Sequence, residues 1–372
     1  MAVVVPTSQL TFSCRLLRQL LRREQDNVFV SPASVGLALG MVAAGAQGST
    51  LAALEQTLGI DAKLAANRAE RLFASLKTLA PGVTVELANS LWARSELTLS
   101  RRYVAAMRES YRGEVRSIDF TLASAPTIVN DWVSRATHGQ INSLVDSIDN
   151  ATVLLLINAT YFHGRWASPF DEKRTIDHEF ATASASVAQV RMMQKSASFS
   201  YMDDSDVQAV RLPYKQGRFH LLVVLPRARL STAAFDAIAQ PESMTRILAS
   251  LRERDGFLGL PRLRLGYTAD LVPELAEMGM ALALTGDADF SGIFDGNVGA
   301  FISRVLHKTR LEIDEQGTTA AAATLVEMSL GTSIMAPAPF EMIVDRPFLV
   351  ALIESETDLP LFIGVIGDPT AR

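Results

Sequence analysis

Apolar positions in the first third of the chain recur with the three- or four-residue spacing of helix faces. Leu10, Cys14, Leu17 and Leu21 fall on one side of such a helix, and arginines occupy other positions. This pattern predicts an amphipathic helix whose apolar stripe faces a core. Cys14 is the one cysteine, so we interpret it as a small buried apolar residue, and no disulfide can form within the chain.

The next stretch, residues 28–48, carries no charge. It is close to the length of a membrane-spanning helix, but the sequence SPAS and several glycines interrupt it. We therefore expect a short strand followed by a buried helix that is capped at Ser34, and no membrane span. The segment STLAALEQTLGI predicts a further helix, which begins with a cap at Ser49 and ends at Gly59.

From residue 83 onward, strand patterns appear between helices. VTVELANSLWA has the alternation of a half-buried strand, and ATVLLLINATYF is apolar almost throughout, as a central strand buried on both faces would be. Two pairs of apolar segments are separated by short polar turns, which predicts antiparallel neighbours. These pairs are residues 207–214 with 219–226, and residues 347–354 with 359–369.

Composition narrows the range of partners. The chain has 372 residues, a net charge of −5 and no run of basic residues, so we expect neither a nucleic-acid nor a membrane partner. The beginning, MAVVVPTSQLTF, lacks the basic start and cleavage motif of an export signal, which favours a cytoplasmic location. Because no repeat, linker or composition break occurs, we expect one α+β domain over residues 1–372, present as a monomer.

Most signatures of catalysis are absent from the sequence. It contains no GxSxG elbow, no GxxxxGK phosphate loop and no GxGxxG after a strand. No two of the five histidines have the spacing of metal ligands, and one cysteine cannot complete a zinc set. We therefore expect no catalytic residue, no bound metal and no cofactor. A dispersed catalytic triad stays open as an alternative, since triads follow geometry rather than order.

The stretch GTTAAAATLVEMSLGTS, residues 317–333, is unusual because it holds a single charge, Glu327. Laid out as a strand, its side chains alternate between two faces. The face that begins at Thr318 and ends at Met328 is free of charge, and Glu327 falls on the other. Alanine is a poor strand former, so this segment is better suited to entering a sheet than to residing in one. A small-residue surface loop is the alternative.

The longer segment LEIDEQGTTAAAAT resembles the hinge of the reactive-centre loop of the serpin family. The resemblance extends over almost the whole chain in a series of ordered segments. They are NVFVSPASVGLALGMVAAGAQGST, NDWVSRATHGQINSLV, LLLINATYFHGRWASPF, VRLPYKQGRFHLLVVLP and DRPFLVALIESETDLPLFIGVIGDP.

This resemblance implies an α+β serpin fold with three β-sheets, eight or nine helices and an exposed reactive-centre loop at about residues 315–339. It also implies a suicide-substrate inhibitor. A target serine protease attacks the loop and forms an acyl-enzyme, and the cleaved loop then inserts as a strand into the main sheet and traps that enzyme. The alternative within the family is a non-inhibitory member that acts as a carrier or chaperone.

The family's hinge residues correspond to particular positions of this chain. Gln316 and Thr319 replace residues that are commonly acidic in the family. Both are expected on the outer side of the hinge, where they should not impair insertion. The whole hinge is Glu315, Gln316, Gly317, Thr318, Thr319, Ala320, Ala321, Ala322 and Ala323.

Two structural groups of the family also have counterparts. A polar cluster beneath the strands that open matches Ser31, Ser34, Asn158 and His307. The tryptophan at the point where the loop first enters the sheet matches Trp166.

The position of the reactive bond stays open between two main interpretations, with Met328 and Met335 as further possibilities. The usual distance from the hinge glycine gives Gly331–Thr332, but glycine offers no side chain to a protease pocket. A shift of one residue gives Leu330–Gly331, which suits chymotrypsin-like enzymes. Chymotrypsin-, elastase- or subtilisin-like proteases are therefore the expected targets.

Overall fold

The computed structural model describes residues 7–23, 27–79, 81–228, 232–296, 299–317, 338–355 and 359–371. Within these ranges it has nine α-helices: α1 (Ser8–Leu21), α2 (Pro32–Ala43), α3 (Gly48–Leu58), α4 (Ala62–Leu76), α5 (Arg101–Tyr111), α6 (Ala125–Ala136), α7 (Thr232–Ile238), α8 (Pro241–Ser250) and α9 (Val272–Leu275). Four short helical turns are η1 (Glu172–Arg174), η2 (Lys215–Gly217), η3 (Ala276–Met280) and η4 (Ala281–Leu284).

The strands of the same ranges are β1 (Val28–Val30), β2 (Val83–Arg94), β3 (Glu114–Ile118), β4 (Leu154–Gly164), β5 (Ile176–Ala181), β6 (Val187–Asp203), β7 (Val207–Pro213), β8 (Phe219–Pro226), β9 (Arg252–Pro261), β10 (Leu263–Asp270), β11 (Ile302–Ile313), β12 (Phe340–Ile343), β13 (Phe348–Glu354) and β14 (Leu359–Ile366). Both predicted antiparallel pairs are confirmed, β7 with β8 and β13 with β14.

One sheet has five strands in the order β10-β11-β4-β2-β3. The predicted central strand is β4, which lies in the middle of this sheet and is buried at nearly every position. Its neighbours differ in direction, because β2 is antiparallel to β4 whereas β11 is parallel to it.

The remaining strands form a hydrogen-bonded path in which the 17-residue strand β6 joins two parts. One part has the order β1-β14-β13-β8-β7, and the other contains β5, β6, β9 and β12. Strand β6 pairs with β5 and β9 along most of its length and with β7 only at its end. The described residues therefore form two hydrogen-bonded sheets, of nine and five strands, and the three sheets that were expected result only if the nine-stranded one is counted as two parts joined by β6.

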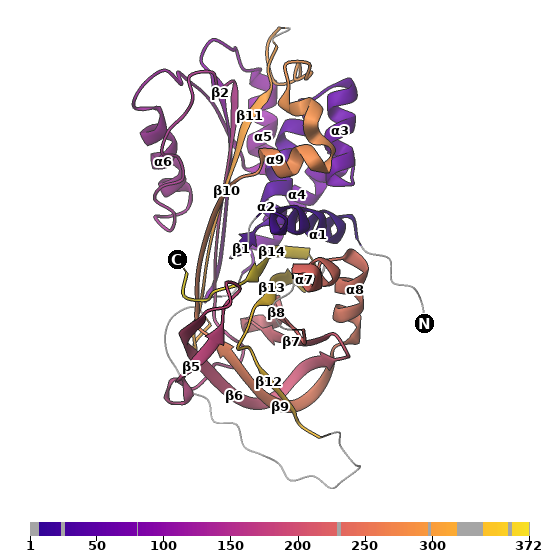
Figure 1. The fold of residues 1–372 in the computed structure, drawn as a ribbon. Helices are drawn as coiled ribbons and strands as arrows, with labels where there is room; N and C mark the ends of the chain where they lie inside the picture. The colour runs from indigo at the N-terminus through magenta and orange to yellow at the C-terminus, as the bar shows by residue number, and fades with distance from the viewer. Residues whose placement is uncertain are drawn as a thin grey trace.

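Helices cover both faces of the five-stranded sheet (Figure 1). Helix α6 lies alone against one face, where Trp132 packs edge-on against Trp92 of β2. Helices α1 to α5 and α9 lie on the opposite side. Apolar side chains of β4 alternate accordingly, with Leu155 and Ile157 in the core under α6 and Leu156 in the larger core.

Helix α2 is buried as predicted, but its predicted cap was wrong. The cap is Ser31, whose hydroxyl accepts a hydrogen bond from the backbone N–H of Ser34. Pro32 occupies the first helical turn, where its fixed φ and missing N–H suit a helix start. The helix therefore begins three residues earlier than the pattern SVGLALGMVAAGA indicated.

Helices α1 and α3 agree with prediction, except that α3 begins at a different residue. Cys14 is buried in α1, and burial raises the pKa of its thiol to about 12. Helix α3 begins at Gly48 after Gln47, which makes no side-chain cap, so the cap expected at Ser49 was wrong. Its end is as predicted, because Gly59 adopts φ +69°.

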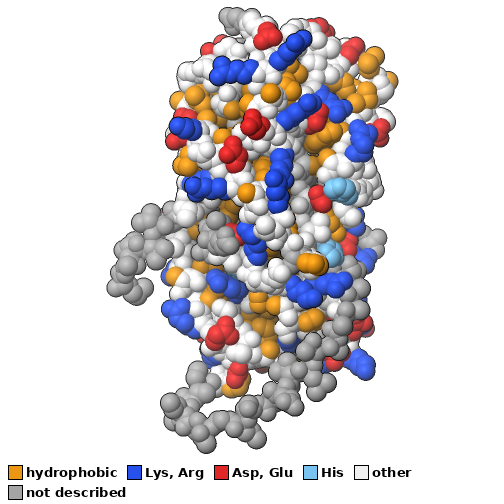
Figure 2. Space-filling model, turned by 180° about the vertical axis from the view of Figure 1, so that it is seen from behind, with side chains coloured by type: hydrophobic (Ala, Val, Ile, Leu, Met, Phe, Trp, Pro, Cys, Tyr) orange, Lys and Arg blue, Asp and Glu red, His pale blue; other side chains and the backbone are white. Residues whose placement is uncertain are grey.

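Figure 2 shows the surface from behind. Basic and acidic side chains are interspersed over this face. In the described part of the chain, no helix is both long and apolar enough to cross a membrane.

Candidate functional site

Three buried polar side chains lie side by side across the middle of the five-stranded sheet. In the strand register His307 of β11 is opposite Asn158 of β4, and Asn158 is opposite Asn89 of β2. Each of the three is at most 2% exposed. We call Asn89, Asn158 and His307 the polar row. It spans the boundary between β4 and β11, so one of its contacts must break if these strands separate.

Histidine 307 is neutral in this row. Burial lowers its pKa to about 3. Its Nε2 atom accepts a hydrogen bond from the backbone N–H of Ser31 at 3.0 Å, so the proton is on Nδ1, which donates to the Oδ1 atom of Asn158. The contact between β4 and β11 in the row is therefore a hydrogen bond between uncharged groups, and breaking it leaves no buried charge.

The start of helix α2 covers the polar row. The Nδ2 group of Asn158 donates to Ser34 Oγ at 2.5 Å and also to Asn89 Oδ1. Ser34 Oγ in turn lies 3.4 Å from Asn89 Oδ1. The residues Ser31, Ser34, Asn158 and His307, which the sequence placed in one cluster, are thus brought together.

A second group of contacts holds the chain where it leaves β11. Trp166, which follows β4, donates from its indole Nε1 to Asp314 O at 2.9 Å and from its backbone N–H to Gln316 O at 3.0 Å. Its ring stacks on Tyr214, with 4.4 Å between ring centroids. Trp166 is 2% exposed, so its role here is to dock the residues after β11 against the Gly164 end of β4.

Glu315 is the charged member of this second group. Its carboxylate is 3% exposed, forms an ion pair with Arg262 at 2.7 Å and accepts a hydrogen bond from Thr175 Oγ1. Phe170 donates its backbone N–H to Glu315 O at 2.8 Å. Burial opposes ionisation, but the hydrogen bonds from Arg262 and Thr175 outweigh it, and the pKa of Glu315 lies below its ordinary value. The residue is therefore fixed as an anion.

Gly317 reverses the chain in a space that admits no side chain. Its φ is +112°, and a Cβ atom placed there would lie 2.3 Å from Gly164 O and 2.4 Å from Trp166 N. Gly317 and Asp314 exchange two backbone hydrogen bonds of 3.1 and 3.2 Å. The turn from Asp314 to Gly317 thus lies against the Gly164 end of β4. We call Trp166, Thr175, Arg262, Glu315 and Gly317 the hinge anchor.

The remaining predicted site residues lie outside the described residues. These are Thr318, Thr319, Ala320, Ala321, Ala322, Ala323, Leu330, Gly331 and Thr332. Gln316 was expected on the outer side of the hinge, and its side chain contacts the exposed Glu172, with Nε2 at 3.4 Å from Oε1.

Sequence reasoning missed three members of the two groups. Asn89 had a usable signal, because it is an amide within the apolar strand pattern VTVELANSLWA. Arg262 and Thr175 had none, since they lie 53 and 140 residues from Glu315 and look like ordinary surface residues in the sequence. Among the described residues, no group of three or more His, Cys, Asp and Glu could hold a metal ion.

The family model described as "Serpin (serine protease inhibitor)" matches residues 7–369, so this chain belongs to the serpin family. Serpins are in general protease inhibitors rather than catalysts, which confirms the expected class of protein and makes a protease the general class of partner.

Relatives and solved structures agree with this assignment. Iripin-8 of Ixodes ricinus is 33% identical over 364 residues, which are 95% of this chain and 90% of that protein. The native state of tengpin, a thermophilic serpin, has a TM-score of 0.88 at 25% identity and covers 97% of this chain and 93% of its own. Human thyroxine-binding globulin with its bound hormone has a TM-score of 0.87 at 26% identity over 98% of both chains.

Proposed function

We propose that this protein is a suicide-substrate inhibitor of serine proteases. The segment that follows Gly317 is cut by the protease and then enters the five-stranded sheet between β4 and β11 as a new strand. The acyl-enzyme, still attached to the cut end, is carried along and trapped. The observation that carries the proposal is the direct parallel pairing of β4 with β11 beside the hinge anchor.

The pairing between β4 and β11 provides a reason for insertion. These strands are parallel neighbours from Leu154 to Phe162 and from Ile302 to Leu311. A strand that turns back after β11 runs antiparallel to both of them. Insertion therefore replaces one parallel ladder with two antiparallel ladders, which are slightly more stable per residue. A strand of this length adds roughly ten ladder hydrogen bonds, each with a net contribution of about 1 kcal/mol.

The hinge anchor also favours insertion of the loop antiparallel to β11. Because the turn from Asp314 to Gly317 already reverses the chain, the following residues need no new turn to run antiparallel to β11. The carboxylate of Glu315, within this turn, is held by Arg262 and Thr175. The anchor can thus serve as a fixed pivot while the loop beyond it moves.

The sequence of the loop removes the main obstacle to insertion. A charge on the face that turns inward would cost several kcal/mol unless it were paired. The face from Thr318 to Met328 has none, and the single charge, Glu327, lies on the alternate face. The substitution Thr318→Arg should therefore convert the inhibitor into a substrate that is cut and released. Thr319→Arg, on the opposite face, is the matched control and should retain inhibition.

The decisive experiment mixes the protein with chymotrypsin-, elastase-, subtilisin- and trypsin-like proteases. An adduct that survives SDS is expected with at least one of them. If every protease that cuts the loop is released in active form, inhibition is excluded and the carrier or chaperone alternative is favoured. The mass of the released C-terminal fragment then distinguishes cleavage at Gly331–Thr332 from cleavage at Leu330–Gly331.

A further inference from the structure

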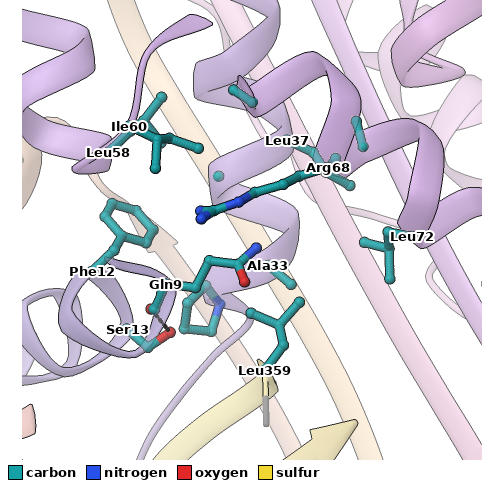
Figure 3. A pocket seen from close by; sticks show the side chains of 14 residues that line it. Gln9, Phe12, Ser13, Ala33, Leu37, Leu58, Ile60, Arg68, Leu72 and Leu359 are labelled. Atoms are coloured by element: carbon teal, nitrogen blue, oxygen red, sulfur yellow. Dashed lines mark hydrogen bonds between the residues drawn. The ribbon is translucent and has the colours of Figure 1, made fainter. Parts of the chain in front are cut away.

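A hollow of about 560 Å³, counted with its open mouth, lies among helices α1, α2 and α4 (Figure 3). It is separate from the hinge anchor and the polar row. Most of its lining is apolar and includes Phe12, Leu37, Leu58, Ile60, Leu72 and Leu359. Without the open mouth and the gaps between atoms its volume is about 70 Å³, so a bound molecule would lie partly in the open mouth.

Among the described residues that line the hollow, Arg68 of α4 is the one ionised side chain. In Figure 3 its side chain extends from the helix across the opening, and the guanidinium lies between Ile60 and Gln9. It donates one hydrogen bond, from Nη1 to Ser8 Oγ at 3.0 Å. In the described part of the chain, no carboxylate lies within ion-pair distance of the Arg68 guanidinium.

The surroundings of Arg68 disfavour its charge. Burial lowers the pKa of Arg68, and the nearby Asp61 offsets this only in part. Asp61 itself is held at the start of α4, where its carboxylate accepts the backbone N–H of Leu64 at 2.7 Å. A guanidinium has five N–H donors in a planar fork that matches a carboxylate. With Ser8 as its one printed partner in the described part of the chain, Arg68 has donors left for a ligand at the edge of an apolar space, an arrangement suited to an amphipathic anion.

Gly36 of α2 keeps this space open. It lies within a helix and lines the hollow, and a Cβ atom placed on it would meet no other atom within 4 Å. Glycine in a helix costs about 0.5–1 kcal/mol relative to alanine. Here neither the backbone angle nor a close neighbour requires glycine. The residue is explained if the hollow has to stay empty for a ligand.

We propose that this hollow binds a small monocarboxylate with an apolar body, such as a medium-chain fatty acid. The carboxylate forms a two-pronged ion pair with Arg68, and the chain lies against Phe12, Leu37 and Leu58. A free phosphate would leave the apolar lining in contact with water, and a neutral apolar molecule would leave Arg68 without a counter-charge.

The test is titration calorimetry of the full chain with octanoate, with octanamide as the neutral isostere. We expect one octanoate per protein molecule. Arg68→Met keeps the length of the side chain without its charge and should weaken octanoate binding by about tenfold or more, while octanamide binding changes little. Arg71→Met, an exposed arginine of the same helix, is the matched control and should keep the affinity of the unaltered protein.

A second variant tests whether octanoate occupies the hollow itself. Gly36→Leu places a side chain in the hollow and should abolish octanoate binding, with thermal melting to verify that the variant is folded. The proposal is overturned if octanoate does not bind with one-to-one stoichiometry. It is also overturned if Arg68→Met binds octanoate as tightly as the unaltered protein does. Because binding is measured without a protease, its outcome is independent of the proposed inhibition.

Discussion

The polar row and the hinge anchor hold the same pair of strands by different chemistry. The contact of the row across β4 and β11 is a hydrogen bond between the neutral side chains of Asn158 and His307. The anchor contains a buried anion, Glu315, that is paired with Arg262, and a glycine in a space that admits no Cβ atom. Since a neutral contact can open without exposing an unpaired charge, the row is suited to separate and the anchor to stay.

The largest expected effect comes from Gly317→Ala. The added methyl group would lie against the backbone of Gly164 and Trp166, and alanine disfavours φ +112°. The hinge turn must then be strained or detached from β4, which should lower the free energy of unfolding by about 3 kcal/mol. Gly266→Ala, where a Cβ atom meets nothing within 4 Å, is the control. Urea unfolding that is equal for the two variants would contradict the close packing of the turn.

A smaller loss is expected from Arg262→Met. It leaves the carboxylate of Glu315 buried with Thr175 as its remaining side-chain partner, and should cost about 2 kcal/mol. Arg264→Met, in β10 two residues after Arg262, removes an exposed arginine that does not pair with Glu315 and is the matched control.

The pH dependence of the Arg262 pair has a definite sign. The pKa of Glu315 is lowered in the folded protein, so its stabilisation is present above the ordinary carboxyl pKa and is lost as the pH falls through the folded value. The difference in free energy of unfolding between Arg262→Met and the unaltered protein should therefore shrink in acid. A difference that is constant with pH would mean that Glu315 is not held as an anion.

The smallest effect concerns the polar row. The folded protein keeps His307 neutral down to about pH 3, whereas the unfolded chain takes up a proton near the ordinary pKa of 6.5. The free energy of unfolding therefore falls as the pH drops from 6.5 towards 3. Burial also lowers the pKa of His220 to about 3, so this residue contributes to the same fall.

His307→Gln should make this fall less steep, by roughly 1 kcal/mol between pH 7 and pH 5.5. His138→Gln, at an exposed position, should leave it unchanged. Unfolding in urea at the two pH values measures both variants. If the free energy of unfolding fell equally in His307→Gln and in the unaltered protein, His307 would already be protonated or exposed to water in the folded state.

The polar row could be predicted more fully from the sequence than the hinge anchor. Asn158 is a polar residue in an otherwise apolar strand, and such a residue needs a buried partner. His307 lies in a strand with several charges, and the family resemblance identified it. Glu315 also belonged to a recognisable hinge. Its partner Arg262, however, is an exposed residue between β9 and β10, and only the three-dimensional arrangement brings the two together. The cap of α2 was misplaced for a local reason, because Ser31 and Ser34 are both good caps and Pro32 decides between them.

The pairing of β4 with β11 could not be predicted from the sequence at all. The same residues of both strands can pair with each other or with a strand between them, since backbone hydrogen bonds do not depend on side-chain identity. Under the proposed insertion one sequence forms two sheets, so we expect the state with fewer strands to be metastable.

Melting before and after a single cut in the loop tests this expectation most directly. Cleavage by a protease that is not trapped should raise the melting temperature of the whole chain by well over ten degrees, because roughly ten additional backbone hydrogen bonds form. A cut protein that melts at the temperature of the intact one would contradict strand insertion between β4 and β11.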